Sequence, residues 1–408
     1  MADSRAARPV PNQPQLSSGR RSFIASTSVS ELEFASMKPS LCFLLMVGLA
    51  AIFQTRAAED HPTLALGSQA PNFDLPGVDG RNWASEDFAP AKVLVVVFTC
   101  NHCPTAQYYE ERLKQLVTDY KDKGVAVVAI MPNDPKSVRL DELGWADLSD
   151  SFEEMKLRAR DRQFNFPYLY DGDTESVARA YGPVATPDVF VFDAARKLRY
   201  VGAIDDSERI QRVTKQYLRD ALDALLAGQE PPVTRTKVVG CSIKWAGKAD
   251  SVQAYMEKLA NEPVKLTPAD ADTLSALRKN NSGKFRLVNF WATWCAPCLA
   301  EFHELVTINR MYRHRDFEVV TVSVNRPDED KEVLKVLKQQ QASCTNLIFA
   351  STDREKLINS FDPTWQGPVP YTVLIAPEGK LLFKQTGSID PLALRQAILN
   401  ALNEQKPW

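Results

Sequence analysis

The feature that most constrains this chain is an apolar run that leads directly into two cysteines spaced by two residues and then into a helical pattern. Residues 287–291 read LVNFW, and Cys295 and Cys298 follow just before that pattern begins. The order of strand, turn, Cys-x-x-Cys and helix places Cys295 at a helix N-terminus, where unpaired N–H groups and the helix dipole stabilise an anion. The thiolate is the reactive form of cysteine, so this order predicts a redox-active pair.

The same order occurs earlier in the chain. Residues 92–98 read KVLVVVF and lead into Cys100, His102 and Cys103, after which apolar residues recur at helical spacing. A structural zinc site is the competing interpretation of such a pair, but a zinc ribbon needs a second pair about 15–20 residues away, and the pair at Cys295 has none. We therefore predict two redox-active disulfides, with no metal and no organic cofactor.

The length and net charge of the chain, and one apolar segment near its start, indicate how many domains it has and whether it is exported. Its 408 residues favour two domains, and a net charge of −2 gives no reason to expect nucleic-acid binding. Residues 37–58 combine a lysine, an apolar run and small residues, and predict a secretory signal peptide, with an uncleaved membrane tether as the alternative. Residues 1–36 are interpreted as a disordered extension or a misassigned start. We therefore expect an exported protein, periplasmic or otherwise extracytoplasmic.

The two halves repeat one order of elements. In each half a Cys-x-x-Cys helix is followed by a buried strand, a helix, a short strand, an X-Pro strand, a partner strand and a closing helix. This alternation predicts an α/β fold with two tandem domains, each a central mixed β-sheet flanked by helices. We expect the first domain over residues 61–228, a linker that includes the segment GCSIKW over 229–265, and the second domain over 266–405.

An X-Pro pair opens a late strand in each half. The pairs are Thr186-Pro187 and Val369-Pro370. Proline cannot donate a hydrogen bond to a sheet ladder, so each belongs at a strand start or in a cis bond. One long amphipathic helix is expected over residues 210–226.

These motifs resemble the thioredoxin superfamily, whose signature is WCxPC, and the second half resembles its TlpA/ResA-type thiol-disulfide oxidoreductases. The resemblance implies that Cys295 attacks as a thiolate and that Cys298 resolves. It also implies that Pro370 is the cis-proline beside the disulfide. The positions implied for substrate binding flank the motif and this proline: Trp294, Pro297, Val369 and Pro370.

Glu301 lies one turn after Cys298, where this branch often carries a glutamate. A partly buried carboxylate at that position could accept a proton from Cys298. The competing interpretation is a solvated helix residue. Asn289 occupies the position of thioredoxin's buried aspartate, so the resemblance provides no proton route there.

The first half resembles the peroxiredoxin-like (AhpC/TSA, redoxin) branch, whose members carry CxHCP. Thr186-Pro187-Asp188 and the segment GCSIKW at residues 240–245 also match that branch. The resemblance implies that Cys100 attacks and Cys103 resolves, with Thr186 and Pro187 at the substrate site.

Two further residues of the first half carry expectations. A histidine in the place of His102 stabilises the thiolate in the disulfide-generating DsbA branch, so we expect the Cys100–Cys103 disulfide to be more oxidising than Cys295–Cys298. Cys241 lies within GCSIKW and is a candidate resolving or relay cysteine, with a structural role as the alternative.

The predicted function is disulfide exchange with protein partners by an exported thiol-disulfide oxidoreductase, which receives its electrons from a partner thiol protein. Two alternatives remain open. Cys103-Pro104-Thr105 resembles the peroxidatic motif of peroxiredoxins, although Ala106 stands where their glutamate is expected, so the first domain could be an antioxidant thiol peroxidase. The third interpretation is a thioredoxin-fold interaction module in which one Cys-x-x-Cys is vestigial.

Overall fold

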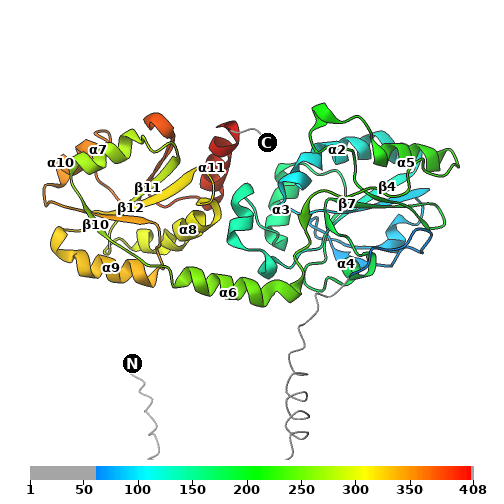
Figure 1. Cartoon of the computed structure of the whole chain (residues 1–408), viewed down its shortest axis with the longest axis horizontal. Coiled ribbons are helices and arrows are strands. Elements are labelled where there is room, and N and C mark those ends of the chain that lie inside the picture. Colours follow the sequence, from blue (N-terminus) through cyan, green and yellow to red (C-terminus); the bar gives the residue numbers. More distant parts are fainter. Residues whose placement is uncertain (1–60, 406–408) are drawn as a thin grey trace, which may run out of the picture. The chain divides into compact units, whose positions relative to one another are not determined.

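The structure is a computed structural model that describes residues 61–405. The expected extension and signal peptide, residues 1–58, lie outside the described residues. Among residues 61–405, no helix is both long and apolar enough to span a membrane. Two mixed sheets of the same general plan, each flanked by helices, organise this part of the chain (Figure 1).

The first sheet has five strands in the order β5-β4-β3-β7-β8. The strands β3, β4 and β5 run parallel to one another, whereas β7 pairs antiparallel with β3 and with β8, so the sheet is mixed as predicted. The central strand β3 is buried along its whole length, as expected for a strand with both faces covered. The strand bounds are β3 Val93–Phe98, β4 Val125–Met131, β5 Tyr168–Tyr170, β7 Asp188–Phe192 and β8 Leu198–Gly202.

Helices cover both faces of this sheet. Alternate residues of β3 point to opposite faces: Val95 packs in a core with Leu113 and Leu222, and Val96 packs in a second core with Tyr181. The first core therefore lies under α2 and α5, and the second under α4. The helix bounds are α2 Pro104–Tyr120, α3 Phe152–Asp161, α4 Ser176–Tyr181 and α5 Tyr217–Leu226.

The long helix expected over residues 210–226 is only partly correct. The α-helix α5 begins at Tyr217, and a single 3₁₀ turn, Ile210–Arg212, precedes it. The carboxylate of Asp206 accepts hydrogen bonds from the backbone N–H and the hydroxyl of Thr214. Such a bond offers the backbone an alternative to helical pairing, and Ile210 is exposed rather than packed.

The second sheet has six strands in the order β10-β13-β12-β11-β14-β15. It is also mixed, with β14 antiparallel to both β11 and β15. The strand β10 and the helix α10 were not expected from the sequence. The strand bounds are β10 Thr267–Ala269, β11 Phe285–Trp291, β12 Phe317–Ser323, β13 Thr345–Phe349, β14 Tyr371–Ile375 and β15 Leu381–Thr386.

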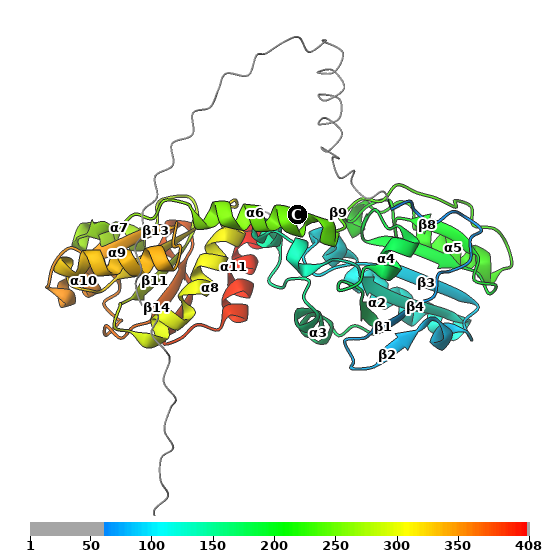
Figure 2. The same ribbon diagram turned by 90° about the horizontal axis from the view of Figure 1, so that it is seen from below.

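Helices flank this second sheet (Figures 1 and 2). Residues of α7, α9 and α10 share one core with Val288 and Phe290 of β11, and residues of α11 share the other core with Leu287. The helix bounds are α7 Ala271–Lys279, α8 Ala296–Tyr312, α9 Asp330–Gln339, α10 Arg354–Phe361 and α11 Pro391–Gln405.

The stretch expected to be a linker, residues 229–265, contains a short strand, a 3₁₀ turn and a helix. The short strand β9 (Cys241–Ser242) pairs antiparallel with β6 (Ala185–Thr186), and α6 (Ala249–Ala260) follows it. Ile243 is also buried. The GCSIKW segment is therefore part of the first domain's fold rather than a free connection.

Candidate active site

Each Cys-x-x-Cys motif lies at a helix N-terminus, but the helix begins at a different point relative to the motif. In the first half α2 begins at Pro104, which makes Cys103 the N-cap residue. In the second half α8 begins at Ala296, which makes Cys295 the N-cap residue. The positive end of the helix dipole therefore faces the second cysteine of one motif and the first cysteine of the other.

The first redox head consists of Cys100, Cys103 and the cis peptide bond Thr186–Pro187. Both cysteines are buried, and their sulfurs lie against Thr186: the Cys103 sulfur is 3.2 Å from its carbonyl oxygen, and the Cys100 sulfur is 3.0 Å from its hydroxyl. Thr186 and Pro187 are themselves buried. The sequence-predicted residues of this head are thus brought together, but away from solvent.

The electrostatics of the first redox head favour a thiolate at Cys103. Hydrogen bonds from the Cys100 thiol and then from the Cys241 thiol hold the pKa of Cys103 well below its ordinary value, although burial opposes them. Burial raises the pKa of Cys100. These shifts favour Cys103, at the helix N-terminus, as the more acidic thiol of the motif, and which of the two cysteines attacks stays a prediction.

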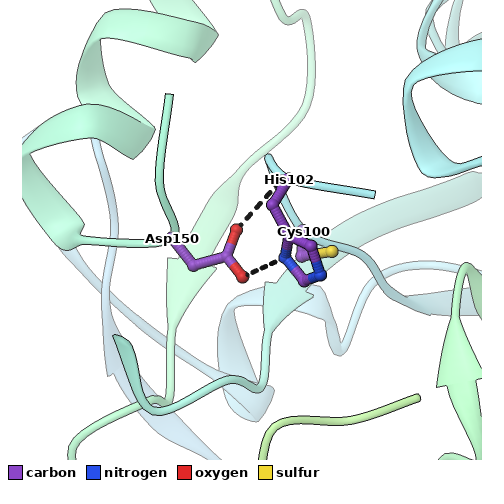
Figure 3. A group of neighbouring side chains, drawn as sticks. All are labelled: Cys100, His102 and Asp150. Carbon is purple, nitrogen blue, oxygen red and sulfur yellow. Dashed lines mark hydrogen bonds and ion pairs between the residues drawn. The ribbon is translucent and has the colours of Figure 1, made fainter. Parts of the chain in front are cut away.

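His102 forms a buried pair with Asp150 beside this motif (Figure 3). The histidine Nδ1 lies 2.6 Å from one Asp150 oxygen, and the other oxygen accepts the backbone N–H groups of Asn101 and His102. Burial lowers the pKa of His102, but the charge of Asp150 and its hydrogen bond outweigh burial, so the net shift is upward. The charge of His102 lowers the pKa of Cys103, as expected, but contributes less than the two thiol hydrogen bonds.

The same group has ligand atoms of the kind that metals use. One such atom from each of Cys100, His102 and Asp150 lies within 4.8 Å of the other two, and His102 Nε2 has no hydrogen-bond partner among residues 61–405. Histidine that binds a metal commonly donates its other ring N–H to a carboxylate. The expectation that no metal is needed therefore stays a prediction.

Asp150 and Asn133 are site residues that the sequence patterns did not indicate. Asn133 Nδ2 donates to Asp150 over 2.7 Å, and its own amide oxygen accepts the backbone N–H of Lys244, which directly follows Ile243. Asp150 lies 48 positions from His102, in an irregular stretch, so nothing in the local periodicity relates the two residues.

Cys241 also contacts the first redox head. Its backbone N–H donates to the Cys103 sulfur over 3.4 Å, and strand β9 pairs Cys241 directly with Thr186. Unlike Cys100 and Cys103, Cys241 is only half-buried.

The second redox head consists of Cys295, Cys298 and the cis peptide bond Val369–Pro370. The two cysteines form a disulfide, and the Cys295 sulfur lies 3.6 Å from the carbonyl oxygen of Val369. Trp294 is 61% exposed and Pro297 is exposed beside them. Val369 is half-buried, whereas Pro370 and the sulfur-bearing Cys295 are buried, so only part of the expected substrate site is at the surface here.

Glu301, on helix α8 one turn after Cys298, is buried rather than solvated. It accepts the backbone N–H of Ile389 over 2.9 Å and lies 3.4 Å from Asn289 Nδ2. Burial raises the pKa of Glu301. The partly buried carboxylate expected at this position is present, and the alternative of a solvated helix residue is wrong.

Comparison with known proteins places this arrangement among thiol-based redox proteins. The sequence model described as the AhpC/TSA family matches residues 66–201 and 262–384, one segment in each half. The thiol-disulfide oxidoreductase ResA of Bacillus subtilis is 31% identical over 107 residues, which are 26% of this chain and 55% of that protein. ResA of Geobacillus thermodenitrificans is 27% identical over 114 residues, 28% of this chain and 61% of that protein. The chain thus spans little more than half the length of these curated relatives.

Similar solved structures include an uncharacterised conserved protein from Geobacillus kaustophilus and a hypothetical protein from Sinorhizobium meliloti. The first is 42% identical, with 44% of this chain and 92% of that chain covered and a TM-score of 0.40. The second is 35% identical, with 45% and 97% covered and a TM-score of 0.40.

Proposed function

This chain belongs to the AhpC/TSA family, and from that premise we propose that it is an exported thiol-disulfide oxidoreductase with two thioredoxin-type redox heads. One observation carries the proposal. In each half, a cysteine at a helix N-terminus has its sulfur within 3.2 or 3.6 Å of the carbonyl oxygen that precedes a cis-proline. A helix N-terminus stabilises the thiolate that disulfide exchange requires.

The second redox head is proposed to act directly on protein partners. The Cys295 thiolate attacks a partner disulfide, so that a Cys295–partner disulfide forms and the other partner sulfur leaves as a thiolate. Cys298 then gives its proton to the buried carboxylate of Glu301 and attacks Cys295, which releases the partner dithiol and leaves the Cys295–Cys298 disulfide. A donor thiol protein returns two electrons to this disulfide.

The proposed partner surface surrounds Cys295. The exposed side chains of Trp294 and Pro297 and the half-buried Val369 offer an apolar contact beside the disulfide. An apolar side chain left at the surface beside a reactive group is typical of a binding site. Export rests on residues 37–58, and the mass of the N-terminal peptide of the protein purified from its native cells would test it.

Reduction of insulin disulfides by the full chain tests the proposed activity. We expect Cys295→Ser with Cys298→Ser to remove most of the activity, and Cys100→Ser with Cys103→Ser to remove the remainder. Cys344→Ser is the matched control, because this free cysteine lies outside both redox heads. If both pairs are replaced and the rate is unchanged, the proposal is wrong. If only one pair matters, the other redox head does not reduce protein disulfides.

A second candidate function, thiol peroxidase, is favoured by the thiolate character of Cys103. A thiolate attacks one oxygen of hydrogen peroxide, so that sulfenic acid forms at the cysteine and hydroxide leaves. Peroxide is small enough to reach a sulfur that a protein partner cannot. Trapping of sulfenic acid on Cys103 in the full chain, with Cys103→Ser as the control, would support this activity, and an unmodified Cys103 would exclude it.

A further inference from the structure

We propose that Cys241 is the third thiol of the first redox head: it forms a disulfide with Cys103, and through this disulfide the buried motif exchanges with partner thiols. The inference rests on the proposed function and assigns a residue and a route to it. Three independent features carry it, namely the pairing of strand β9, the contacts of the Cys103 sulfur and the difference in exposure among the three cysteines.

Strand β9 occupies the place where a partner strand would otherwise add. It pairs antiparallel with β6, and Cys241 lies opposite Thr186, the residue before the cis-proline. Addition of an extended segment to an exposed edge is a common mode of peptide recognition. In the second redox head, no strand among residues 61–405 is paired with Val369.

Gly240 allows this close approach. A Cβ atom at Gly240 would lie 2.0 Å from the carbonyl oxygen of Thr186, which is far inside contact distance. Only a glycine lets the backbone before Cys241 come this near to the cis-proline turn. Gly240 therefore makes the pairing of β9 with β6 possible, although it has no side chain that could react.

The three cysteines meet at Cys103. The Cys103 sulfur accepts the backbone N–H of Cys241 over 3.4 Å, and the neighbouring thiols of Cys100 and Cys241 both lower the pKa of Cys103. Cys100 and Cys103 are 2% and 0% exposed, whereas Cys241 is half-buried. A partner sulfur therefore meets Cys241 before it can meet either cysteine of the motif.

The exchange balances without a further reactant. With the Cys103–Cys241 disulfide formed, a partner thiolate attacks the sulfur of Cys241, the bond between the two cysteines breaks, and Cys103 leaves as the stabilised thiolate. A second partner thiolate then attacks the partner sulfur of the mixed disulfide, and Cys241 leaves and takes up a proton. Two electrons pass from the partner dithiol to the protein, and the partner becomes a disulfide.

The same disulfide can be stored in the buried motif. The thiolate of Cys100 attacks Cys103 within the Cys103–Cys241 disulfide, which forms Cys100–Cys103 and releases Cys241, with no net gain or loss of electrons. The reverse step moves the disulfide outward again. Cys103 thus alternates between one buried and one half-exposed partner.

The test uses the full chain with Cys295→Ser and Cys298→Ser, so that only the first redox head titrates. In this background Cys100→Ser removes the competing thiol, and we expect oxidised glutathione to produce a Cys103–Cys241 disulfide, identified by peptide mapping without reduction. With Cys100 present, Cys241→Ser should slow reduction of the Cys100–Cys103 disulfide by reduced thioredoxin about tenfold or more, and affect reduction by dithiothreitol far less.

Gly240→Ala provides a second variant that keeps all three thiols. It should displace β9 and abolish the Cys103–Cys241 disulfide in the Cys100→Ser background, whereas Gly247→Ala, which has open space around it, should leave that disulfide in place. If Cys100–Cys103 titrates but no Cys103–Cys241 disulfide forms, or if Cys241→Ser leaves the thioredoxin rate unchanged, the inference is overturned and the proposed function stands. If Cys100–Cys103 does not titrate at all, the proposed function of this head fails as well.

Discussion

Replacement of Asp150 by asparagine should destabilise the first domain strongly. The backbone N–H groups of Asn101 and His102 donate to the same oxygen of Asp150, and asparagine retains this oxygen. The Nδ2 of asparagine would replace the other oxygen, which accepts hydrogen bonds from His102 and Asn133. His102 can become neutral and accept, whereas Asn133 cannot reverse, because its own amide oxygen already accepts the N–H of Lys244. One charged hydrogen bond is lost and one buried donor is left unpaired.

The expected loss is about 3–5 kcal/mol, the range found when one partner is removed from a buried ion pair. The pKa of His102 is raised above its ordinary 6.5, so its contribution is fully present below that pH and is lost as the pH rises through the raised value. The pKa of Asp150 is lowered below its ordinary 3.8, so its contribution is present above that pH and is lost as the pH falls through the lowered value. The effect of Asp150→Asn should therefore be largest between these two values and shrink at alkaline pH.

Hydrogen exchange of the full chain measures this effect in the first domain alone, because peptides that cover β3 report the opening of that sheet. Exchange would be followed from about pH 5 to about pH 9 after correction for the intrinsic rate. Glu153→Gln is the matched control, since this nearby carboxylate is 80% exposed and pairs with Lys156 at the surface, where ion pairs contribute about 0–1 kcal/mol. A loss below about 1 kcal/mol, or a loss that does not change with pH, would refute the reasoning.

Three further predictions follow from the two redox heads. Glu301→Gln should slow insulin reduction by the second redox head about tenfold or more at neutral pH, and it should remove the rise in rate as the pH passes through the raised pKa of Glu301. Glu304→Gln on the same helix is the control, and an unchanged pH profile would exclude the proton-acceptor role of Glu301. The ultraviolet absorbance of a thiolate should persist down to about pH 5 in the reduced chain, vanish in Cys103→Ser and remain in Cys100→Ser; the opposite pattern would restore Cys100 as the attacking residue. The reduction potential of the first redox head should be higher than that of the second by at least about 30 mV, equivalent to about a tenfold change in equilibrium constant, because a stabilised thiolate favours the reduced form of the head. Separate equilibration of each disulfide with glutathione would show equal or inverted potentials if this is wrong.

The overall plan of the fold could be predicted from local patterns. Buried strands such as β3 and β11 are continuous apolar runs, and the helices after them show helical spacing, so both strand–motif–helix units were evident. The sequence placed Thr186-Pro187 and Val369-Pro370 at strand starts or in cis bonds, and in the structure both peptide bonds are cis. Where polar side chains compete for the backbone, as at Asp206, the predicted helix was too long.

The sequence by itself determined that two pairs of cysteines lie at helix N-termini, because strand, turn and helix signals act over a few neighbouring residues. Only the structure showed that Cys103, and not Cys100, caps the helix of the first motif, since the first turn of α2 begins after Cys103. It also decided that Asp150 meets His102 and that Cys241 covers Cys103. These contacts join residues 48 and 138 positions apart, and their formation depends on how whole elements pack rather than on any local pattern.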